Sequence, residues 1–491
     1  MLLSTTFCTG GLARHKYYAE TNNQFEDQNK KRTLAPRHHE PHQQQNQMSA
    51  RILIIGAGRS STALINYCLD QSDRLGWNVT VADADPNAAA AKVGKHPRGS
   101  TAWLDVTKTN DRRDLIGRAD IVISLLPAHL HIEVAHDCIR LKKHLVTASY
   151  VSQELWRLGD EARDRELIFM GEMGLDPGVD HMTAMQRLSA IRKKGGKITA
   201  FRSFTGGLIA PESNNNPWGY KFTWNPRNVV LAGQGTAQYL HEGKRKFLPY
   251  QRVFDKQWDV EIDGLGDFEA YANRDSLLYR EQYGLEGIPT ILRGTIRYPG
   301  FCDSWSALVQ IGLTNGDFPI LDSETLTYHE LMEALAPNGP GSVKDRVAQM
   351  LEISPNSDIM KRLVWLGLFR KKRIKLRDAT PALILEDLLL KKWQLEPEDR
   401  DMIVMQHQIE YTLNGHKYRD VSDLTMRGEN AQDTAMARLV GLPMGIFARL
   451  ISEGKINSKG VHIPTMAEVY EPVLKEMENY GMVLNHKTED L

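Results

Sequence analysis

A short apolar run that breaks into a glycine turn constrains the fold of this chain more than any other feature. Residues 51–61 read Arg-Ile-Leu-Ile-Ile-Gly-Ala-Gly-Arg-Ser-Ser, and an apolar helical pattern follows them. Four consecutive apolar residues are typical of a strand buried on both faces of a parallel sheet. Gly56 permits a tight turn and Gly58 lets the backbone approach a pyrophosphate, toward which the next helix points its amides. The pattern predicts a dinucleotide-binding site; the alternative is the same turn in a domain that binds no nucleotide.

An acidic residue follows the second expected strand, which spans residues 78–82. Asp83 lies 25 residues after Gly58. A carboxylate near this spacing hydrogen-bonds the adenosine ribose and repels a 2′-phosphate. Asp83, with Asp85 beside it, therefore predicts a preference for NAD. NADP stays an alternative, because Arg59 beside the turn can help to hold a phosphate.

Strand and helix patterns alternate up to about residue 175. Further strands are expected at residues 102–104, 119–126, 144–148 and 167–170, with helical patterns such as 132–141 between them. This alternation predicts a Rossmann-type, doubly wound parallel sheet, whose ligands bind beyond the carboxyl ends of the strands. The residues expected along that edge are Gly56 to Ser61, Asp83, Asp105, Leu125 to Pro127, Ser149, Tyr150 and Glu172 to Asp176.

The pattern changes from about residue 176, where strand-like runs are separated by turns rather than by crossover helices. These runs, at 198–204, 268–271, 290–298 and 402–411, predict a second α/β domain with a mixed sheet. Stretches 435–440 and 445–451 resemble a terminal helix that returns to the first domain. The expected organisation is a disordered extension at 1–47, a Rossmann domain at 48–175 plus 425–491, a substrate-binding domain at 176–325 plus 401–424, and a helical subdomain at 326–400.

Composition excludes several classes of function. The chain has 491 residues, too many for one core, and its 61 basic and 61 acidic side chains leave no net charge. The balance argues against nucleic acid as a partner, because nucleic acid needs a basic face. We expect no metal site and no membrane segment. Four cysteines, whose spacing suits neither a metal nor a disulfide framework, fit a cytoplasmic protein: Cys8, Cys68, Cys138 and Cys302.

Residues 1–47 differ from the rest of the chain. They are rich in Asn, Gln, His and charged residues and have almost no apolar periodicity. Such a segment cannot bury enough apolar surface to offset the entropy of ordering it. Because Met48 stands just before the first expected strand, we hypothesise that it is the natural start of the protein.

Three blocks rich in glycine and proline lie at residues 171–181, 203–224 and 273–301. This density is typical of backbone that turns sharply or approaches a ligand. Arginine forks suit carboxylates, so Arg274 and Arg297 indicate a ligand with several carboxylates, and Asp176 suits an ammonium group. The structural alternatives are a salt bridge from Arg274 to Asp275 or another acid, and a turn-capping role for Asp176.

The same blocks carry a family resemblance. They contain Gly-Leu-Asp-Pro-Gly-Val-Asp-His at 174–181, Gly-Gly-Leu-x-Ala-Pro-Glu at 206–212, Asn-Pro-x-Gly-Tyr-Lys-Phe at 216–222 and Arg-Gly-Thr-x-Arg-Tyr at 293–298. With these strings the chain resembles the glutamate-forming saccharopine dehydrogenases, also called saccharopine reductases, from about residue 51 to residue 482. The resemblance implies a Rossmann domain, a substrate domain, a helical domain and a homodimer.

The reaction implied by the resemblance oxidises the secondary amine of saccharopine with NAD(P). Water then splits the imine into L-glutamate and 2-aminoadipate 6-semialdehyde, a step of lysine metabolism whose physiological direction stays open. Matching positions imply substrate contacts by Ser149, Tyr150, Asp176, Arg274, Thr295, Ile296 and Arg297. They imply cofactor contacts by Arg59, Ser60, Ser61, Thr62, Asp83, Asp105 and Val106, to which the glycine turn and the sheet edge add Gly56, Gly58 and Leu125.

The groups available for proton transfer are Tyr150, Asp176 and Lys221, and no spacing decides between them. For Lys221, a third carboxylate contact and a packed lysine are equally expected. Bound water or the substrate's own amine are alternatives to a side chain as the proton-transfer group. His181 is expected to be structural.

Two departures from the fungal members of the family matter. The chain has Thr205 where they often have Cys, and it has Asp83 where the members that use NADP lack an acid. The competing functions are a dehydrogenase for another amino-acid imine, such as carboxynorspermidine, and a non-catalytic dinucleotide sensor or scaffold.

Overall fold

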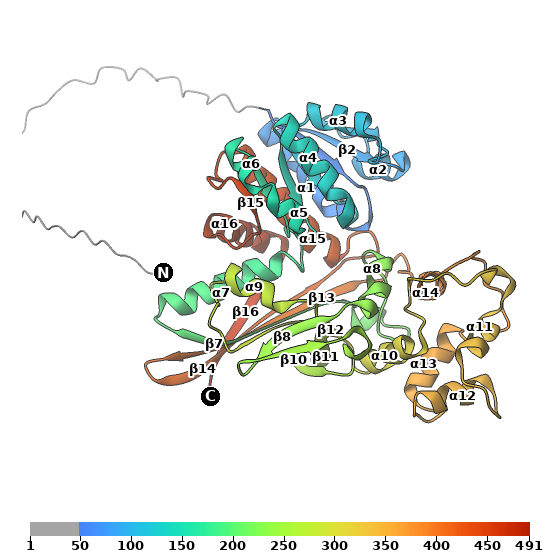
Figure 1. Cartoon of the computed structure of the whole chain (residues 1–491). Helices are drawn as coiled ribbons and strands as arrows, with labels where there is room; N and C mark the ends of the chain where they lie inside the picture. The colour runs from blue at the N-terminus through green and yellow to red at the C-terminus, as the bar shows by residue number, and fades with distance from the viewer. Residues whose placement is uncertain (1–48) are drawn as a thin grey trace, which may run out of the picture. The chain divides into compact units, whose positions relative to one another are not determined.

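The computed structural model describes residues 49–491, and its first domain is built on a seven-stranded parallel sheet (Figure 1). The strand order is β15-β6-β5-β4-β1-β2-β3, so the direction of winding reverses between β1 and β4. The expectations for residues 1–47 and for Met48 lie outside the described residues. The strands are β1 (Arg51–Ile55), β2 (Asn78–Asp83), β3 (Gly99–Trp103), β4 (Ile121–Ser124), β5 (His144–Thr147), β6 (Ile168–Met170) and β15 (Gly460–His462).

Both faces of this sheet are covered, as the apolar run of β1 predicts. Ile52 and Ile54 pack into one hydrophobic cluster, while Leu53 and Ile55 pack into another. Successive side chains of a strand point to opposite faces, so an uninterrupted apolar strand requires helices on each side. The helices of this domain are α1 (Thr62–Leu75), α2 (Pro86–Val93), α3 (Thr109–Arg118), α4 (His131–Leu141), α5 (Gln153–Arg157), α6 (Gly159–Asp164), α15 (Ala435–Ser452) and α16 (Ala467–Met477).

Helix α15 packs closely against α1 although the two are far apart in the sequence. A Cβ atom on Gly441 would lie 2.7 Å from the Leu64 nitrogen, and one on Gly445 would lie 2.6 Å from the Tyr67 ring. The two expected helical stretches thus form one helix that contains Pro443. Contrary to our expectation, α15 is long and apolar enough to cross a membrane, but 72% of it is buried inside the fold. Packing therefore accounts for its apolar surface.

The second domain is built on a nine-stranded mixed sheet. Its main path is β10-β11-β12-β7-β13-β14-β16, in which only β12 and β7 are parallel, and β8 and β9 join it through β12. The strands are β7 (Lys197–Ile209), β8 (Ala237–His241), β9 (Lys244–Leu248), β10 (Gln257–Ile262), β11 (Gly266–Ala272), β12 (Thr290–Arg297), β13 (Asp401–Leu413), β14 (His416–Arg427) and β16 (Leu484–Asp490). Its helices are α7 (Val179–Lys193), which is the longest, α8 (Pro226–Leu231), α9 (Tyr279–Gln282) and α10 (Phe301–Ile311).

The end of the chain corrects one expected domain boundary. Strand β16 pairs with β14, so residues 484–490 belong to the second sheet and not to the Rossmann domain. The assignment of all of 425–491 to the first domain was therefore wrong. The strand has no apolar alternation that could reveal it, because β16 is a polar strand at the edge of the sheet.

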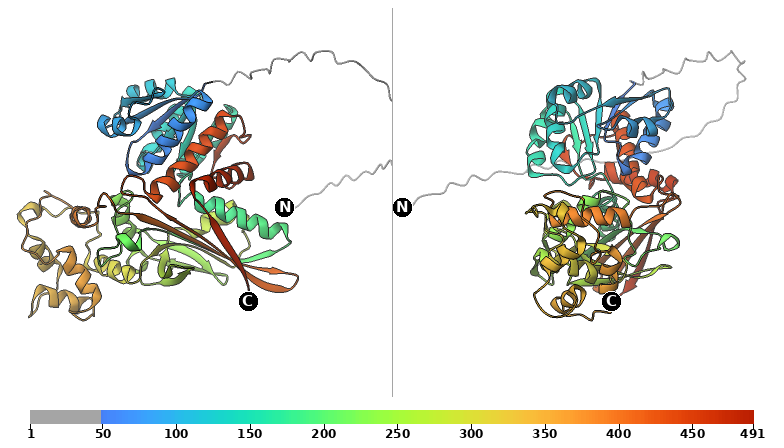
Figure 2. Two further views of the ribbon diagram at one scale, coloured as in Figure 1. Left: turned by 180° about the vertical axis from the view of Figure 1, so that it is seen from behind. Right: turned by 90° about the vertical axis from the view of Figure 1, so that its right-hand side faces the viewer.

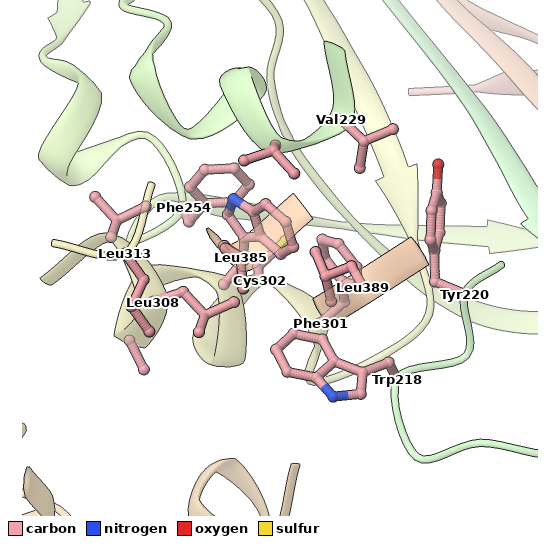
Figure 3. Close-up of a cluster of buried hydrophobic side chains, with 14 of the residues drawn as sticks. Trp218, Tyr220, Val229, Phe254, Phe301, Cys302, Leu308, Leu313, Leu385 and Leu389 are labelled. Atoms are coloured by element: carbon pink, nitrogen blue, oxygen red, sulfur yellow. The ribbon is translucent and has the colours of Figure 1, made fainter. Parts of the chain in front are cut away.

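Residues 326–400, the expected helical subdomain, form four helices joined by turns and share a core with the second sheet. The helices are α11 (Tyr328–Leu335), α12 (Val343–Met350), α13 (Asp358–Leu366) and α14 (Pro381–Lys392). Figure 2 shows them gathered at one end of that sheet. Leu385 and Leu389 of α14 lie in the same cluster as Trp218, Tyr220 and Phe301 (Figure 3). The helices and the sheet therefore exclude water from one continuous core.

Candidate functional site

The glycine turn after β1 leaves open space where a dinucleotide needs it. Gly56 has a φ of 111°, and a Cβ there would lie 3.2 Å from the Cβ of Leu125. No atom lies within 4 Å of the position that a Cβ on Gly58 would occupy. Residues Arg59–Ser61 form a 3-10 turn that leads directly into α1 at Thr62. The predicted cofactor residues of this segment therefore surround a helix N-terminus suited to a pyrophosphate.

Asp83 meets this turn in space, as its spacing predicts. Its carboxylate accepts hydrogen bonds from the Ala57 N–H at 2.6 Å and from the Asp85 N–H at 2.8 Å. Lys92 of α2 reaches the same turn, where its ammonium donates to Ser61 Oγ at 2.8 Å and to the Gly58 carbonyl. Burial lowers the pKa of Lys92 to about 8, against the opposing effect of Asp83. Sequence analysis missed Lys92, because a lysine on a short surface helix carries no signal of its own.

The other expected cofactor residues lie at the ends of neighbouring strands. Asp105 follows β3, and its carboxylate accepts from the Thr107 hydroxyl at 2.6 Å, which holds its pKa below the usual value. The Val106 carbonyl accepts from the buried Arg112 at 2.6 Å. Leu125 follows β4 and its N–H donates to the Ile55 carbonyl at 2.9 Å. The structure thus brings these residues to one edge of the parallel sheet.

Arg59 extends from the turn to the second domain. Its Nη1 donates to the Phe222 carbonyl at 3.3 Å. Phe222 belongs to the 216–222 block, so this contact joins the expected cofactor site to one of the glycine- and proline-rich segments. The guanidinium has an acceptor within the protein, which weakens the argument that Arg59 is free to hold a 2′-phosphate.

Ser149 and Tyr150 follow β5 and occupy different surroundings. The Ser149 hydroxyl lies 2.8 Å from His131 Nε2. The Tyr150 hydroxyl donates to Asp176 Oδ1 at 3.3 Å. Burial raises the pKa of Tyr150, so this phenol stays protonated and can donate a hydrogen bond.

Asp176 already has a cationic partner. Arg293 Nη2 donates to Asp176 Oδ1 at 2.6 Å and to Asp180 Oδ2 at 2.5 Å. Both side-chain partners found for Asp176 in residues 49–491, Arg293 and Tyr150, are on Oδ1, which leaves Oδ2 available to an amine. Burial raises the pKa of Asp176 to about 6, although Arg293 opposes the shift. Asp176 can therefore be ionised near neutral pH and still gain or lose a proton close to it.

Arg274 stacks against Tyr150. Its guanidinium carbon lies 5.1 Å from the centre of the Tyr150 ring, and its φ of 51° is in the left-handed region. The neighbouring Asp275 carboxylate accepts from the Leu277 N–H and the Gln238 side chain, and no Arg274–Asp275 ion pair is found within the described chain. The structure therefore does not show the alternative of a salt bridge between Arg274 and Asp275.

Arg297 is a buried cation in an aromatic environment. Its guanidinium carbon lies 5.1 Å, 5.7 Å and 5.2 Å from the ring centres of Tyr220, Tyr271 and Phe301. Its Nη1 donates to the Ile296 carbonyl at 2.8 Å and its Nη2 to the Tyr271 hydroxyl at 3.5 Å, while its Nε has no partner among residues 49–491. Glu269 is its cross-strand neighbour, but that carboxylate accepts from the Gly300 N–H at 2.7 Å and from the Cys302 N–H.

No other buried arginine of residues 49–491 lacks an ion pair with an acidic side chain. Arg112, Arg293 and Arg346 each form an ion pair with an acidic side chain, whereas Arg297 forms none. Burying an unpaired charge is costly unless an anion compensates it. Arg297 therefore points to an anionic ligand.

Two neighbours of Arg297 in β12 were also expected at the site. Ile296 is fully buried, so neither its side chain nor its main chain is exposed in this structure. Thr295 lies opposite Tyr271 in the β11–β12 register and beside Thr205 of β7. Gly206 permits this packing, since a Cβ there would lie 2.6 Å from the Ile296 carbonyl oxygen.

Lys221 does not belong to this group. Its side chain is buried and its ammonium forms an ion pair with Asp399 at 2.5 Å. This ion pair neutralises the charge of Lys221 and does not support the expected catalytic or carboxylate-binding role, which stays a prediction. The alternative of a packed lysine is the one the structure shows.

His181 is structural, as expected, and supports the loop of Tyr150. Its Nε2 lies 2.8 Å from Glu172 Oε2, and its Nδ1 lies 2.5 Å from the Tyr283 hydroxyl. Glu172 Oε1 in turn accepts from the Val151 N–H at 3.0 Å. This buried network fixes the segment after β5 against α7.

Comparison with known proteins decides the family. The first domain matches the family model described as the saccharopine dehydrogenase NADP binding domain over residues 52–170, and residues 174–482 match the saccharopine dehydrogenase C-terminal domain. The chain belongs to the saccharopine dehydrogenase family. The expected dinucleotide-binding domain and the expected fold class are thereby confirmed.

Several members of the saccharopine dehydrogenase family resemble the chain over most of its length. The NADP+-dependent, L-glutamate-forming saccharopine dehydrogenase of Saccharomyces cerevisiae is 33% identical, over 90% of this chain and 100% of that protein. The corresponding protein of Pyricularia oryzae is 33% identical over 89% and 98%. The alpha-aminoadipic semialdehyde synthase of Arabidopsis thaliana is 32% identical over 89% of this chain, but the chain spans only 45% of that relative.

Solved structures give the same result. Apo saccharopine dehydrogenase (L-Glu forming) from Saccharomyces cerevisiae aligns with a TM-score of 0.80 at 30% identity, covering 90% of this chain and 100% of that one. The homospermidine synthase of Legionella pneumophila, solved in complex with NAD, aligns with a TM-score of 0.53 at 13% identity and shares the fold alone.

Four residues of this saccharopine dehydrogenase family member escaped sequence analysis: Arg293, Asp180, His131 and Lys92. Arg293 and Asp180 stood inside blocks that were singled out, so the density of glycine and proline marked their neighbourhood without assigning them a role. His131 begins α4, and nothing in the sequence connects it to Ser149. Their roles follow from contacts between distant segments.

Proposed function

We propose that this chain is an oxidoreductase that acts on the CH–NH bond of saccharopine. It interconverts saccharopine and water with L-glutamate and 2-aminoadipate 6-semialdehyde, using a nicotinamide dinucleotide. The observation that carries this proposal is the unpaired, buried Arg297, which needs an anionic ligand, together with Arg274 on the ring of Tyr150. Saccharopine has three carboxylates, one primary ammonium and one secondary amine. The relatives named above support the choice of this substrate over others with fewer carboxylates.

The site divides the recognition of such a ligand among a few groups. Arg297 and Arg274 are the carboxylate partners, and Asp176 Oδ2 is the acceptor for an amine. Arginine binds a carboxylate through two parallel N–H donors, which adds orientation to affinity. Thr295, which is partly exposed, lies on the same strand as Arg297 and can add a hydroxyl contact.

Asp176 is the group best suited to take the proton of the secondary amine. Its pKa of about 6 leaves it mainly ionised at pH 7 and above, and close enough to neutrality to exchange a proton. A bound nicotinamide supplies hydride acceptance, and the hydride leaves the carbon that becomes the aldehyde. Tyr150, protonated throughout, orients Asp176 by its hydrogen bond. Water then adds to the imine carbon, and the carbon–nitrogen bond breaks to release glutamate.

For the cofactor we propose NAD in preference to NADP. The support is the Asp83 carboxylate, which lies 2.6 Å from the Ala57 nitrogen beside the glycine turn and would face a 2′-phosphate. The fungal relatives are named for NADP+, and Lys92 brings a positive charge to the same turn, so both point the other way.

The deciding experiment is the production of NADH or NADPH from saccharopine at alkaline pH by the purified protein. Turnover with NAD supports both proposals, and turnover with NADP alone keeps the reaction but overturns the cofactor proposal. Folded protein that binds a dinucleotide yet turns over neither overturns the reaction. A carboxynorspermidine-type substrate and a sensor role are then tested by turnover and by binding. The homodimer and the cytoplasmic location stay predictions.

A further inference from the structure

A buried histidine joins the ends of two neighbouring strands of the Rossmann sheet. His131, the first residue of α4, places Nδ1 3.0 Å from Ser124 Oγ and Nε2 2.8 Å from Ser149 Oγ. Ser124 ends β4, next to Leu125, which is expected at the cofactor site, and Ser149 follows β5, beside Tyr150. The side chains of Ser124 and His131 are 0% and 4% exposed, so water cannot replace these partners.

The donors and acceptors in the hydrogen-bonded series Ser124–His131–Ser149 can be assigned. Apart from Nδ1 of His131, no side-chain partner is found for the Ser124 hydroxyl in residues 49–491. A buried hydroxyl proton without an acceptor is costly, so Ser124 donates to Nδ1. A neutral imidazole with an acceptor at Nδ1 carries its proton on Nε2. His131 Nε2–H therefore donates to Ser149 Oγ.

This assignment sets the direction in which Ser149 can act. Its oxygen receives the imidazole proton, so its own O–H is left to donate, and no acceptor for it is found in the described part of the chain. Ser149 is half-buried and lies next to Tyr150, which contacts Asp176 and Arg274. A hydroxyl with a fixed donor direction at this place matches a carboxylate oxygen of the ligand.

We propose that His131 is a positioning residue, which holds the Ser149 hydroxyl as a hydrogen-bond donor to a substrate carboxylate. The inference rests on the proposed function, because it takes the ligand to be a polycarboxylate. His131 does not touch the ligand in this arrangement. It acts through Ser149, and Ser124 in turn holds the His131 tautomer.

The test measures the KM for saccharopine and, separately, the dissociation constant of the reduced dinucleotide from its fluorescence. Ser149→Ala and His131→Leu should each raise KM by about tenfold or more, the effect of losing a hydrogen bond to a charged group. The double variant should be no worse than Ser149→Ala alone, because both changes remove the same interaction. The dissociation constant of the dinucleotide should stay within about twofold, well below the effect of one lost hydrogen bond.

Three further variants separate positioning from a general structural role. His131→Gln keeps an N–H donor near Ser149 and should recover most of the affinity. Ser124→Ala releases the tautomer without touching Ser149 and should raise KM by a few-fold. The matched control is His144→Leu in the same domain: His144 Nδ1 accepts from the Ile168 N–H at 3.1 Å at the far end of β5, and its loss should leave KM unchanged.

Two outcomes would overturn the inference. One is a double variant whose KM increase is the product of the two single increases, which would show that His131 and Ser149 act independently. The other is a His131→Leu protein with unchanged KM, or with weaker dinucleotide binding alone. Failure of the wild-type protein to turn over saccharopine would instead overturn the proposed function, and the inference with it.

Discussion

Arg293 donates to Asp176 over 2.6 Å, and the same guanidinium nitrogen holds Asp180. Arg293 is 3% exposed. Either carboxylate would be costly to bury here in its charged form without this cation. Asp176, the residue that we expected to bind a substrate amine, therefore already has one oxygen bonded within the protein. Asp176 Oδ1 forms the structural contacts, and Oδ2 is the oxygen that we expect to accept from the substrate amine.

This pair predicts that Arg293 is needed for folding more than for substrate affinity. Arg293→Leu should lower the free energy of unfolding by about 3–5 kcal/mol, because two buried carboxylates lose their partner. Chemical denaturation would measure the loss. The variant Arg293→Leu, Asp176→Asn, Asp180→Asn should recover much of the stability but not the activity, and a stable single variant would contradict the prediction.

Arg297 should behave in the opposite way. Arg297→Leu is expected to raise the KM for saccharopine by about 10- to 100-fold and to change stability little, since no carboxylate loses an ion pair. The measurement is steady-state kinetics beside a melting curve. Arg346→Leu is the control, because Arg346 is also buried but pairs with Glu333 in the helical segment. A large loss of stability with an unchanged KM would assign Arg297 to the core instead.

The pKa of Asp176 predicts the acid limb of the activity profile. Burial raises this pKa to about 6, so the carboxylate becomes protonated as the pH falls through that value and can no longer accept from an amine. We expect kcat/KM for saccharopine to fall below about pH 6. The limb should disappear in Asp176→Asn, whose residual activity would be low. A limb at the same pH in that variant would assign the titration to another group.

Asp83 should control the choice of cofactor. Replacing it with Ala removes a ribose acceptor and a charge that repels phosphate, so the ratio of kcat/KM with NAD to that with NADP should fall about 10- to 100-fold. Asp85→Ala is the matched control, because Asp85 caps α2 by accepting from the Asn87 N–H at 2.9 Å. An equal effect of both changes would show that only general charge matters.

His407 predicts how acid weakens the fold. Burial lowers its pKa from the ordinary 6.5 to about 4 in the folded chain. The unfolded chain then binds more protons between these values, so stability falls as the pH drops from 6.5 to 4, by up to about 3 kcal/mol for this residue. His407→Leu should flatten this part of the curve. His407 Nε2 lies 2.7 Å from the Thr183 hydroxyl, which keeps its hydrogen bond to the Val179 carbonyl at 2.7 Å after the substitution. An unchanged curve would exclude His407 as a source of acid sensitivity.

Local patterns were enough to predict the parallel sheet of the first domain and its glycine turn. The strand, turn and helix at residues 51–75 and the acid at Asp83 are encoded within short segments, and the carboxyl ends of parallel strands must meet at one edge. Long-range pairing was not predictable in the same way. Strand β16 is a polar edge strand that pairs with β14, whose paired residues lie 60 to 72 positions earlier, and nothing in its own sequence marks it.

The sequence by itself determined the type of sheet, the glycine turn, the family and the residue types that a polycarboxylate with amines requires. Only the tertiary structure decided which charges are already neutralised. It paired Lys221 with Asp399 and Arg293 with Asp176, and within residues 49–491 it left Arg297 without an ion pair to an acid. The physical reason is that the cost of a buried charge depends on its neighbours within a few ångströms, and those neighbours come from segments that are distant in the chain.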